Sequence, residues 1–269
     1  MRKSRAAIAG GVIVAVFVAV AALAPVLAPY EPLRGQLGER LMQPDGRHWF
    51  GTDELGRDVL SRVLYGARIS LQIQIAAVGL ALVVGTALGV IAGYVGRWPD
   101  LLIMRVIDVM MAFPGIFLAL AIIAALGTGL GNVIIASAIF LVPQFARIVR
   151  GSVLTLKEKE FVEAARALGE GDVTIILRYL LPNSLAPIIV QTSLRMATVL
   201  LTASGLSFLG LGVQPPSPEW GAMLSNARAY MITAPHVATV PGLAIMVVVL
   251  GFNLLGDGLR DALDPRLSE

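Results

Sequence analysis

Few side chains in this sequence could do covalent chemistry, and their spacing does not group them into a site. The 269 residues include no cysteine, so disulfides, thiolate metal sites and cysteine nucleophiles are excluded. His48 and His236 are isolated from each other, and neither has the neighbouring Asp or Glu spacing of a zinc site. No serine, histidine and aspartate are grouped as in a hydrolase. The sequence therefore predicts no metal site, no bound cofactor and no enzymatic reaction in this chain.

Three charged residues stand in strongly apolar segments, where a charge is expensive. Arg105 and Asp108 are three residues apart, a spacing that places both on one helix face, so we expect a structural ion pair between them, with a substrate or proton site on the transport pathway as the alternative. Arg195 has no acid within four residues. It belongs either to a transport pathway or a subunit contact, or it is paired by another helix or extends to the membrane surface.

The most conspicuous charged interruption of the apolar sequence covers residues 155–182, called the elbow below. Thr155 and Glu158 have the spacing of a capping box, which predicts a helix from about residue 156. The apolar side chains that follow recur at i, i+3, i+4 and i+7, so they form one stripe on this helix, with Glu163 away from its centre. The stripe consists of Phe161, Ala164, Ala165 and Leu168.

Glycines predict a bend after this helix. Gly169 and Gly171 permit the positive backbone angles that end a helix and turn the chain. Asp172 is placed to cap a second short helix over 173–181, which Pro182 is expected to stop or redirect. Two such helices can dock into a groove on a partner protein. Alternatively, the elbow is an amphipathic connector that lies on lipid headgroups.

A membrane-embedded fold must position these residues. Hydrophobic residues make up 57% of the chain and charged residues only 14%, with a mean hydropathy of +0.79, whereas a soluble domain carries about a quarter charged residues. Continuous apolar runs without period-2 alternation predict helices instead of barrel strands. Six runs are long enough to cross a bilayer: 6–28, 69–95, 101–126, 133–149, 185–211 and 237–255.

Six spans place both chain ends on one side of the membrane. The Lys and Arg residues between spans favour the side of the chain ends, which predicts that the ends and the elbow are cytoplasmic. In the second span, Gly85, Gly89 and Gly93 recur every four residues and predict close helix packing. Pro114 and Pro143 predict kinks in the third and fourth spans.

The elbow also carries a family resemblance. Glu163-Ala164-Ala165, Gly169 after three further residues, and Leu181-Pro182 resemble the EAA-x3-G-x9-I-x-L-P loop of binding-protein-dependent ABC import permeases. Tyr179 departs from this pattern, which prefers isoleucine there, although an apolar ring can fill a similar pocket. Other stretches resemble the C-type permease subunit of the dipeptide/oligopeptide/nickel subfamily over nearly the whole chain: HWFGTDELGRD (48–58), YGARISL (65–71), GLSFLGLGVQPPSPEWGAML (205–224) and GDGLRDALDPR (256–266).

The resemblance implies an all-α membrane protein with the type I ABC importer permease fold, six transmembrane helices and cytoplasmic coupling helices in the EAA loop. It implies that the elbow docks on an ATPase subunit through Phe161, Glu163, Ala164, Ala165, Leu168, Gly169, Leu181 and Pro182. ATP and Mg²⁺ would then bind to partner subunits, and the sequence agrees, since it contains no G-x-x-x-x-G-K-[ST] phosphate loop. The further partners implied are a homologous B-type permease, a second ATPase subunit and an extracytoplasmic binding protein.

The expected organisation is an anchor helix at 1–30, an extracytoplasmic loop with an interfacial helix at 31–68, a permease core at 69–260 and a cytoplasmic tail at 261–269. The resemblance implies import of di- or oligopeptides across the inner membrane, with nickel complexes, glutathione and opine-like solutes as alternative cargoes. An ion-coupled secondary transporter is the alternative of another class, for which inverted repeats and buried coupling acids would be typical.

Overall fold

The computed structural model describes residues 5–263, and these residues form helices and loops with no strand beyond one isolated bridge between Thr52 and Asp58. The expected tail at 261–269 lies mostly outside the described residues. The helices are α1 (Arg5–Leu27), η1 (Leu37–Glu39), α2 (Val59–Val95), α3 (Arg97–Ala112), α4 (Gly115–Leu126), α5 (Leu130–Leu156), α6 (Glu160–Ala167), α7 (Asp172–Thr174), η2 (Ile175–Leu180), α8 (Leu181–Asn183), α9 (Leu185–Phe208), α10 (Trp220–Ala227), η3 (Arg228–Tyr230) and α11 (His236–Leu263).

Five of these helices, α1, α2, α5, α9 and α11, are each long and apolar enough to cross a membrane. A sixth crossing exists only if α3 and α4 are counted together, because they meet at an angle of 96°. Pro114, which lacks a backbone N–H and cannot continue a helix, stands at the start of α4. The predicted kink in the third span is therefore a full break, whereas Pro143 lies inside the continuous helix α5.

The helices α2 and α5 approach each other closely along the glycine repeat. A Cβ atom on Gly85 would lie 2.5 Å from the Cβ of Phe145, and one on Gly89 would lie 2.6 Å from the carbonyl oxygen of Ala146. Gly93 faces Val153 in the same way. The predicted role of these glycines in packing is confirmed, because no larger side chain fits at these positions.

A second packed region joins α1, α2, α9, α10 and α11. The ring of Phe17 lies 5.9 Å from that of Trp220 and 6.3 Å from that of Phe252. The indole Nε1 of Trp220 donates a hydrogen bond of 2.9 Å to the carbonyl of Val63. Residues 59–68 are the first turns of α2, with no break before the second span. The helix starts where the Asp58 carboxylate accepts from the Ser61 amide at 2.7 Å.

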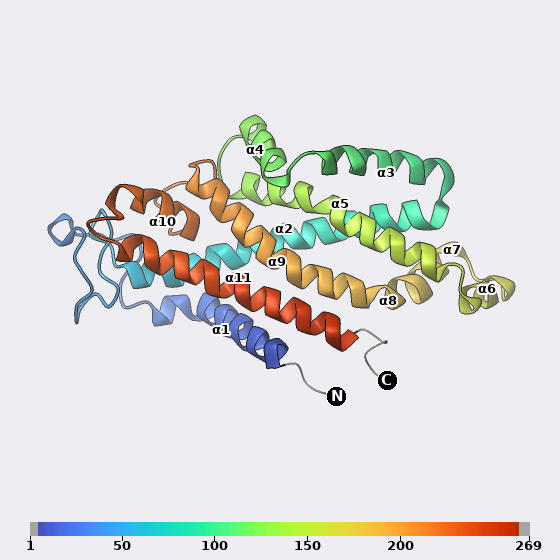
Figure 1. The fold of residues 1–269 in the computed structure, drawn as a ribbon, viewed down its shortest axis with the longest axis horizontal. Helices are drawn as coiled ribbons and strands as arrows, with labels where there is room; N and C mark the ends of the chain where they lie inside the picture. Colours follow the sequence, from blue (N-terminus) through green and yellow to red (C-terminus); the bar gives the residue numbers. More distant parts are fainter. Residues whose placement is uncertain (1–4, 264–269) are drawn as a thin grey trace.

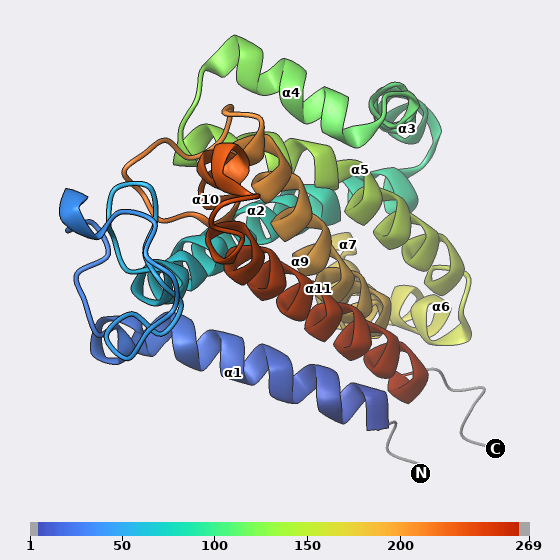
Figure 2. The ribbon, with the colours of Figure 1, turned by 60° about the vertical axis from the view of Figure 1, so that its left-hand side comes forward.

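The two ends of the bundle differ in what they carry (Figure 1). The start of α1 and the end of α11 lie at the same end as α6 and α7, while α10 and the loop between α1 and α2 lie at the opposite end. Figure 2 shows the same helices from a second direction, with α9 again running between α5 and α11. The elbow is therefore at one extreme of the molecule and extends beyond the described chain ends.

Candidate functional site

The first helix of the elbow starts later than the capping box predicts. Helix α5 continues through Leu156, and the hydroxyl of Thr155 donates back to the carbonyl of Gly151 at 3.1 Å instead of capping a new helix. Helix α6 begins at Glu160 after Lys159, without a side-chain cap. The predicted start is wrong because Leu156 packs against the same buried cluster as Val153, so α5 continues through Leu156.

The predicted apolar stripe of α6 is divided between two faces. Of its four residues only Ala165 points inward, 3% exposed. Phe161 and Leu168 are exposed, Leu168 by 84%, and Ala164 is exposed as well. The other inward residue is Val162, fully buried, which the sequence analysis missed although its i, i+3 spacing with Ala165 is a signal for it.

The inward face of α6 packs against three membrane helices and the chain that follows the elbow. Val162 and Ala165 belong to one buried cluster with residues of α2, α5, η2 and α9. Its other buried members are Val90, Val149, Val153, Ile175, Leu180 and Ile188. A movement of α6 must therefore displace the ends of these helices, because close-packed side chains transmit displacement.

The glycine bend after α6 is confirmed at Gly169, whereas Gly171 has a φ of −73° and takes no positive backbone angle. Gly169 has a φ of +84°, which L side chains rarely adopt. Its amide donates to the carbonyl of Arg166 at 3.0 Å, and the amide of Glu170 donates to the carbonyl of Ala165 at 3.1 Å. These two bonds form a Schellman motif, which fixes the direction in which the chain leaves α6.

The second helix of the elbow does not stop at Pro182. α7, η2, α8 and α9 follow one another with almost no interruption, and η2 is a π-helix in which the amide of Leu181 donates to the carbonyl of Ile176. This wider turn directly precedes the proline, which supplies no N–H of its own. The predicted short helix is therefore the membrane-proximal start of α9, and movement of the elbow reaches that span directly.

Polar contacts also join the elbow to the end of α2. The hydroxyl of Tyr94 donates to the Asp172 carboxylate at 2.5 Å, and the Arg166 guanidinium lies 5.9 Å from the centre of the Tyr94 ring. Lys157 donates to the carbonyl of Gly93 at 3.1 Å. Asp172 thus binds Tyr94 instead of capping a helix. Residues before and after the glycine bend both contact α2 and hold the elbow to it.

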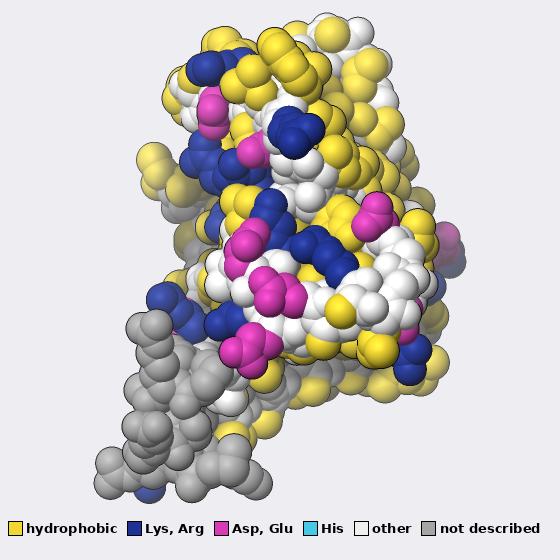
Figure 3. All heavy atoms as spheres, turned by 90° about the vertical axis from the view of Figure 1, so that its right-hand side faces the viewer, with side chains coloured by type: hydrophobic (Ala, Val, Ile, Leu, Met, Phe, Trp, Pro, Cys, Tyr) yellow, Lys and Arg dark blue, Asp and Glu magenta, His cyan; other side chains and the backbone are white. Residues whose placement is uncertain are grey.

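The outward surface of the elbow is open. Glu163, Gly169 and Pro182 are exposed, and Leu181 is half-buried. The ring of Phe161 stacks on that of Tyr179 at 6.4 Å, so the residue that departs from the family pattern supports a predicted docking residue. Figure 3 views this end of the molecule, where basic and acidic side chains gather with hydrophobic ones between them. Such a mixed surface suits contact with a protein.

The charged residues of the apolar segments pair differently from the prediction. Asp108 binds Arg147 of α5 at 2.6 Å, not Arg105, because α5 lies beside α3 and its side chain reaches across. Both members of this pair are about half exposed. The Arg195 guanidinium faces Gln191 one turn earlier on α9, at 2.6 and 2.9 Å when the amide oxygen is turned toward it.

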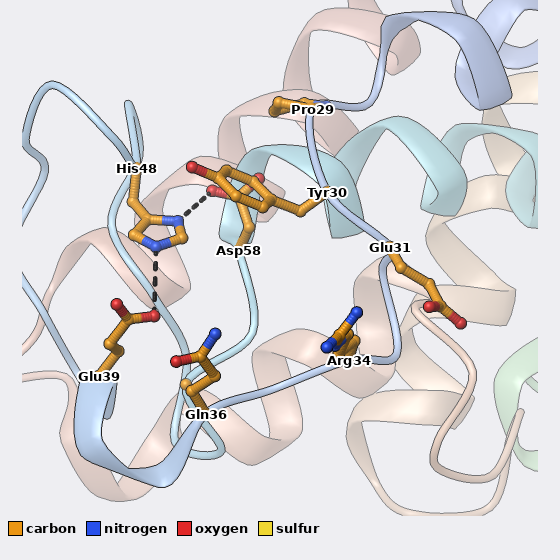
Figure 4. Close-up of a pocket in the computed structure, with 9 residues that line it drawn as sticks. Pro29, Tyr30, Glu31, Arg34, Gln36, Glu39, His48 and Asp58 are labelled. Atoms are coloured by element: carbon orange, nitrogen blue, oxygen red, sulfur yellow. Dashed lines mark hydrogen bonds and ion pairs between the residues drawn. The ribbon is translucent and has the colours of Figure 1, made fainter.

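At the opposite end of the molecule, the loop between α1 and α2 forms a polar cavity of about 390 Å³ (Figure 4). His48 lies between two carboxylates, 2.9 Å from Asp58 and 3.6 Å from Glu39, so this histidine is not isolated in space. Backbone amides of His48 and Arg47 hold the pKa of Asp45 below its usual range. Among the described residues no group of three His, Asp or Glu side chains could hold a metal ion.

Family models match most of the chain. Residues 85–269 match the family described as binding-protein-dependent transport system inner membrane component. Residues 1–44 match the N-terminal TM domain of oligopeptide transport permease C.

Curated proteins of similar sequence match nearly the full length. A dipeptide transport system permease protein of Alkalihalophilus pseudofirmus is 52% identical, over 99% of this chain and 88% of the relative. A glutathione transport system permease protein of Pectobacterium atrosepticum is 51% identical, over 98% of this chain and 88% of the relative.

Solved structures show the same fold at low sequence identity. An inward-facing structure of the MetNI methionine ABC transporter aligns with a TM-score of 0.63 at 18% identity, covering 76% of this chain and 97% of that chain. A crystal structure of an amino acid ABC transporter with histidines aligns with a TM-score of 0.58 at 16% identity, covering 76% and 94%. About three quarters of this chain thus shares the fold of these transporter chains.

Proposed function

This chain belongs to the family of binding-protein-dependent transport system inner membrane components, and we propose from that premise that it is the C-type permease subunit of an ATP-driven importer of di- or oligopeptides. The observation that carries the cargo assignment is the 52% identity, over 99% of the chain, to a dipeptide permease. Glutathione, itself a small peptide, is the second candidate, because glutathione permeases are similar to the same degree.

The elbow is the surface through which we propose that the importer's ATPase acts. Its outward residues Phe161, Glu163 and Leu168 are exposed, while its inward residues are packed among α2, α5 and α9. A docked subunit that closes on ATP would therefore push on the spans through a rigid connection. ATP and Mg²⁺ belong to that subunit in this proposal, and hydrolysis is not a reaction of this chain.

The proposed complex contains a homologous B-type permease, two cytoplasmic ATPase subunits and an extracytoplasmic binding protein. Both ends of this chain and the elbow are placed on the cytoplasmic side of the inner membrane. The shared end of the bundle supports this placement, since the excess of Lys and Arg flanks the same end. The loop between α1 and α2 then faces the binding protein.

Uptake measurements test the cargo. Cells that lack this chain should lose uptake of radiolabelled dialanine and trialanine, and a plasmid copy should restore it. Retained peptide uptake with loss of glutathione uptake would establish the second candidate instead. Uptake that persists after ATP is depleted, driven by an imposed ion gradient, would contradict the ATP-driven mechanism and favour a secondary transporter.

A further inference from the structure

A line of polar side chains runs along one face of the membrane-spanning helix α9. Gln191, Arg195, Thr198 and Thr202 follow at i, i+4, i+7 and i+11, a spacing that places all four on one side of a helix over about 16 Å. We call them the α9 polar stripe. Gln191 is buried, and the other three are only partly covered by the described residues. An apolar environment would leave such groups poorly solvated.

Packing contacts within the chain use other faces of α9. The Ser193 hydroxyl donates to the carbonyl of Phe252 on α11 at 3.3 Å. The carbonyl of Met196 accepts from the Gln74 amide of α2 at 3.1 Å. Val199 and Ala203 are buried in a cluster that includes residues of α5. By the rotation of 100° per residue, the α9 polar stripe lies on a face of the helix that none of these contacts uses. The helix α9 itself runs between α5 and α11 (Figures 1 and 2).

The hydrogen bonds along the stripe leave one charge uncompensated. The hydroxyls of Thr198 and Thr202 donate to the carbonyls one turn earlier, at 3.2 and 2.9 Å. Gln191 offers Arg195 only a neutral amide oxygen. No carboxylate of residues 5–263 forms an ion pair with Arg195. A cation at the middle of a spanning helix requires an anion or water, so its partner comes from outside the described chain.

A cavity of about 390 Å³ adjoins the stripe toward the end that carries the elbow. Side chains of α5, α9 and α11 line it, including Gln191 of the stripe and a second cation, Arg260. The open side of α9 therefore continues into a recess that also presents positive charge. Both features favour a passing anionic group over lipid tails.

We propose that the α9 polar stripe lines the translocation path and that Arg195 binds the carboxylate of the solute in transit. The inference rests on the proposed function and deepens it, because it assigns the cargo to solutes that carry a free carboxylate, such as the C-terminus of a peptide. An acid of the companion permease at Arg195 is the competing arrangement, and it would close the stripe off from water.

The absence of native cysteine makes accessibility of the stripe directly measurable. In the complete importer in inside-out vesicles and in proteoliposomes, Thr198→Cys and Thr202→Cys should react with membrane-impermeant methanethiosulfonates, read as a mass shift of this chain. Saturating trialanine supplied with the loaded binding protein and ATP should slow the reaction at least threefold. The matched control is Val83→Cys, 68% exposed on α2 among apolar neighbours, which should not react. Stripe cysteines as unreactive as this control would overturn the proposal.

The charge of Arg195 is tested with the same cysteine. At Thr198→Cys, a sulfonate reagent should react at least fivefold faster than its trimethylammonium counterpart of the same reactive group, after correction for their rates with a free thiol. Arg195→Gln should remove this preference and lower trialanine uptake at least tenfold, while Arg195→Lys should preserve both. An unchanged preference in Arg195→Gln would refute the role of Arg195. Trialanine uptake by the unsubstituted importer reports on the proposed function separately, so the two failures are distinguishable.

Discussion

At the scale of single residues, the structure depends on positions where adding or removing one side-chain atom changes the packing. The glycines of α2 could be predicted from sequence, because a four-residue repeat of small residues in an apolar run has one main physical use. The partner of Asp108 could not, since Arg105 and Arg147 offer the same charge and only the placement of α5 beside α3 decides between them. Val162 was missed because the four-residue stripe beside it fitted a helix equally well.

We expect Gly89→Ala to weaken the contact between α2 and α5. The added Cβ would lie 2.6 Å from the carbonyl oxygen of Ala146 and 2.8 Å from the Cβ of Val149, and overpacking of this kind costs about 1–3 kcal/mol. Gly79→Ala is the matched control on the same helix, where a Cβ meets nothing within 4 Å. Thermal unfolding in detergent should show a lower Tm for Gly89→Ala only. Equal Tm values would contradict the packing.

We expect Glu219→Ala to destabilise the start of α10. The buried carboxylate accepts hydrogen bonds from the amides of Gly221 and Ala222 at 3.0 and 2.8 Å, and loss of such a cap costs about 0.5–2 kcal/mol. Glu219→Gln keeps an oxygen acceptor at this position and should lose less stability. The free energies of unfolding of both variants, measured in the same detergent, test this order, and a larger loss in Glu219→Gln would contradict it.

At the scale of elements, the bend of the elbow could be predicted and its boundaries could not. Gly169 permits a backbone angle that few other residues adopt, so a glycine here predicts a bend whatever the neighbouring helices do. The capping box at Thr155 is a weaker, local signal, and the burial of α5 outweighs it. Pro182 likewise suggests a helix end, but a π-turn before it allows the helix to continue into α9.

We expect Gly169→Val to uncouple ATP hydrolysis from transport while the chain still inserts into the membrane. A β-branched residue at a φ of +84° is strained, so the elbow would leave α6 in another direction. Gly171→Ala is the control, because the φ of Gly171 is −73° and a Cβ there meets nothing within 4 Å. Stimulation of ATPase activity by loaded binding protein should fall in the first variant only. Full stimulation in Gly169→Val would show that the bend does not transmit the motion.

At the scale of the whole molecule, the long apolar runs and the charged interruption between two of them predicted an all-helical membrane protein with an elbow between two spans. The fold class and the position of the elbow both follow from the hydropathy of long segments, which single side-chain contacts do not alter. The break of 96° between α3 and α4 required the packed structure. We propose that the elbow receives work from a separate ATPase and passes it through Val162 and Ala165 to α2, α5 and α9.

Cross-linking at Leu168 tests this central claim most directly. The side chain is 84% exposed, and the chain has no native cysteine, so Leu168→Cys carries a single reactive thiol on the outward face of α6. In cells that express the complete importer, a short thiol-to-amine cross-linker should join this residue to the ATPase subunit, and the yield should change when ATP is bound. A cysteine at Leu168 that never captures a nucleotide-hydrolysing subunit, or that is labelled from outside intact cells, would contradict the account.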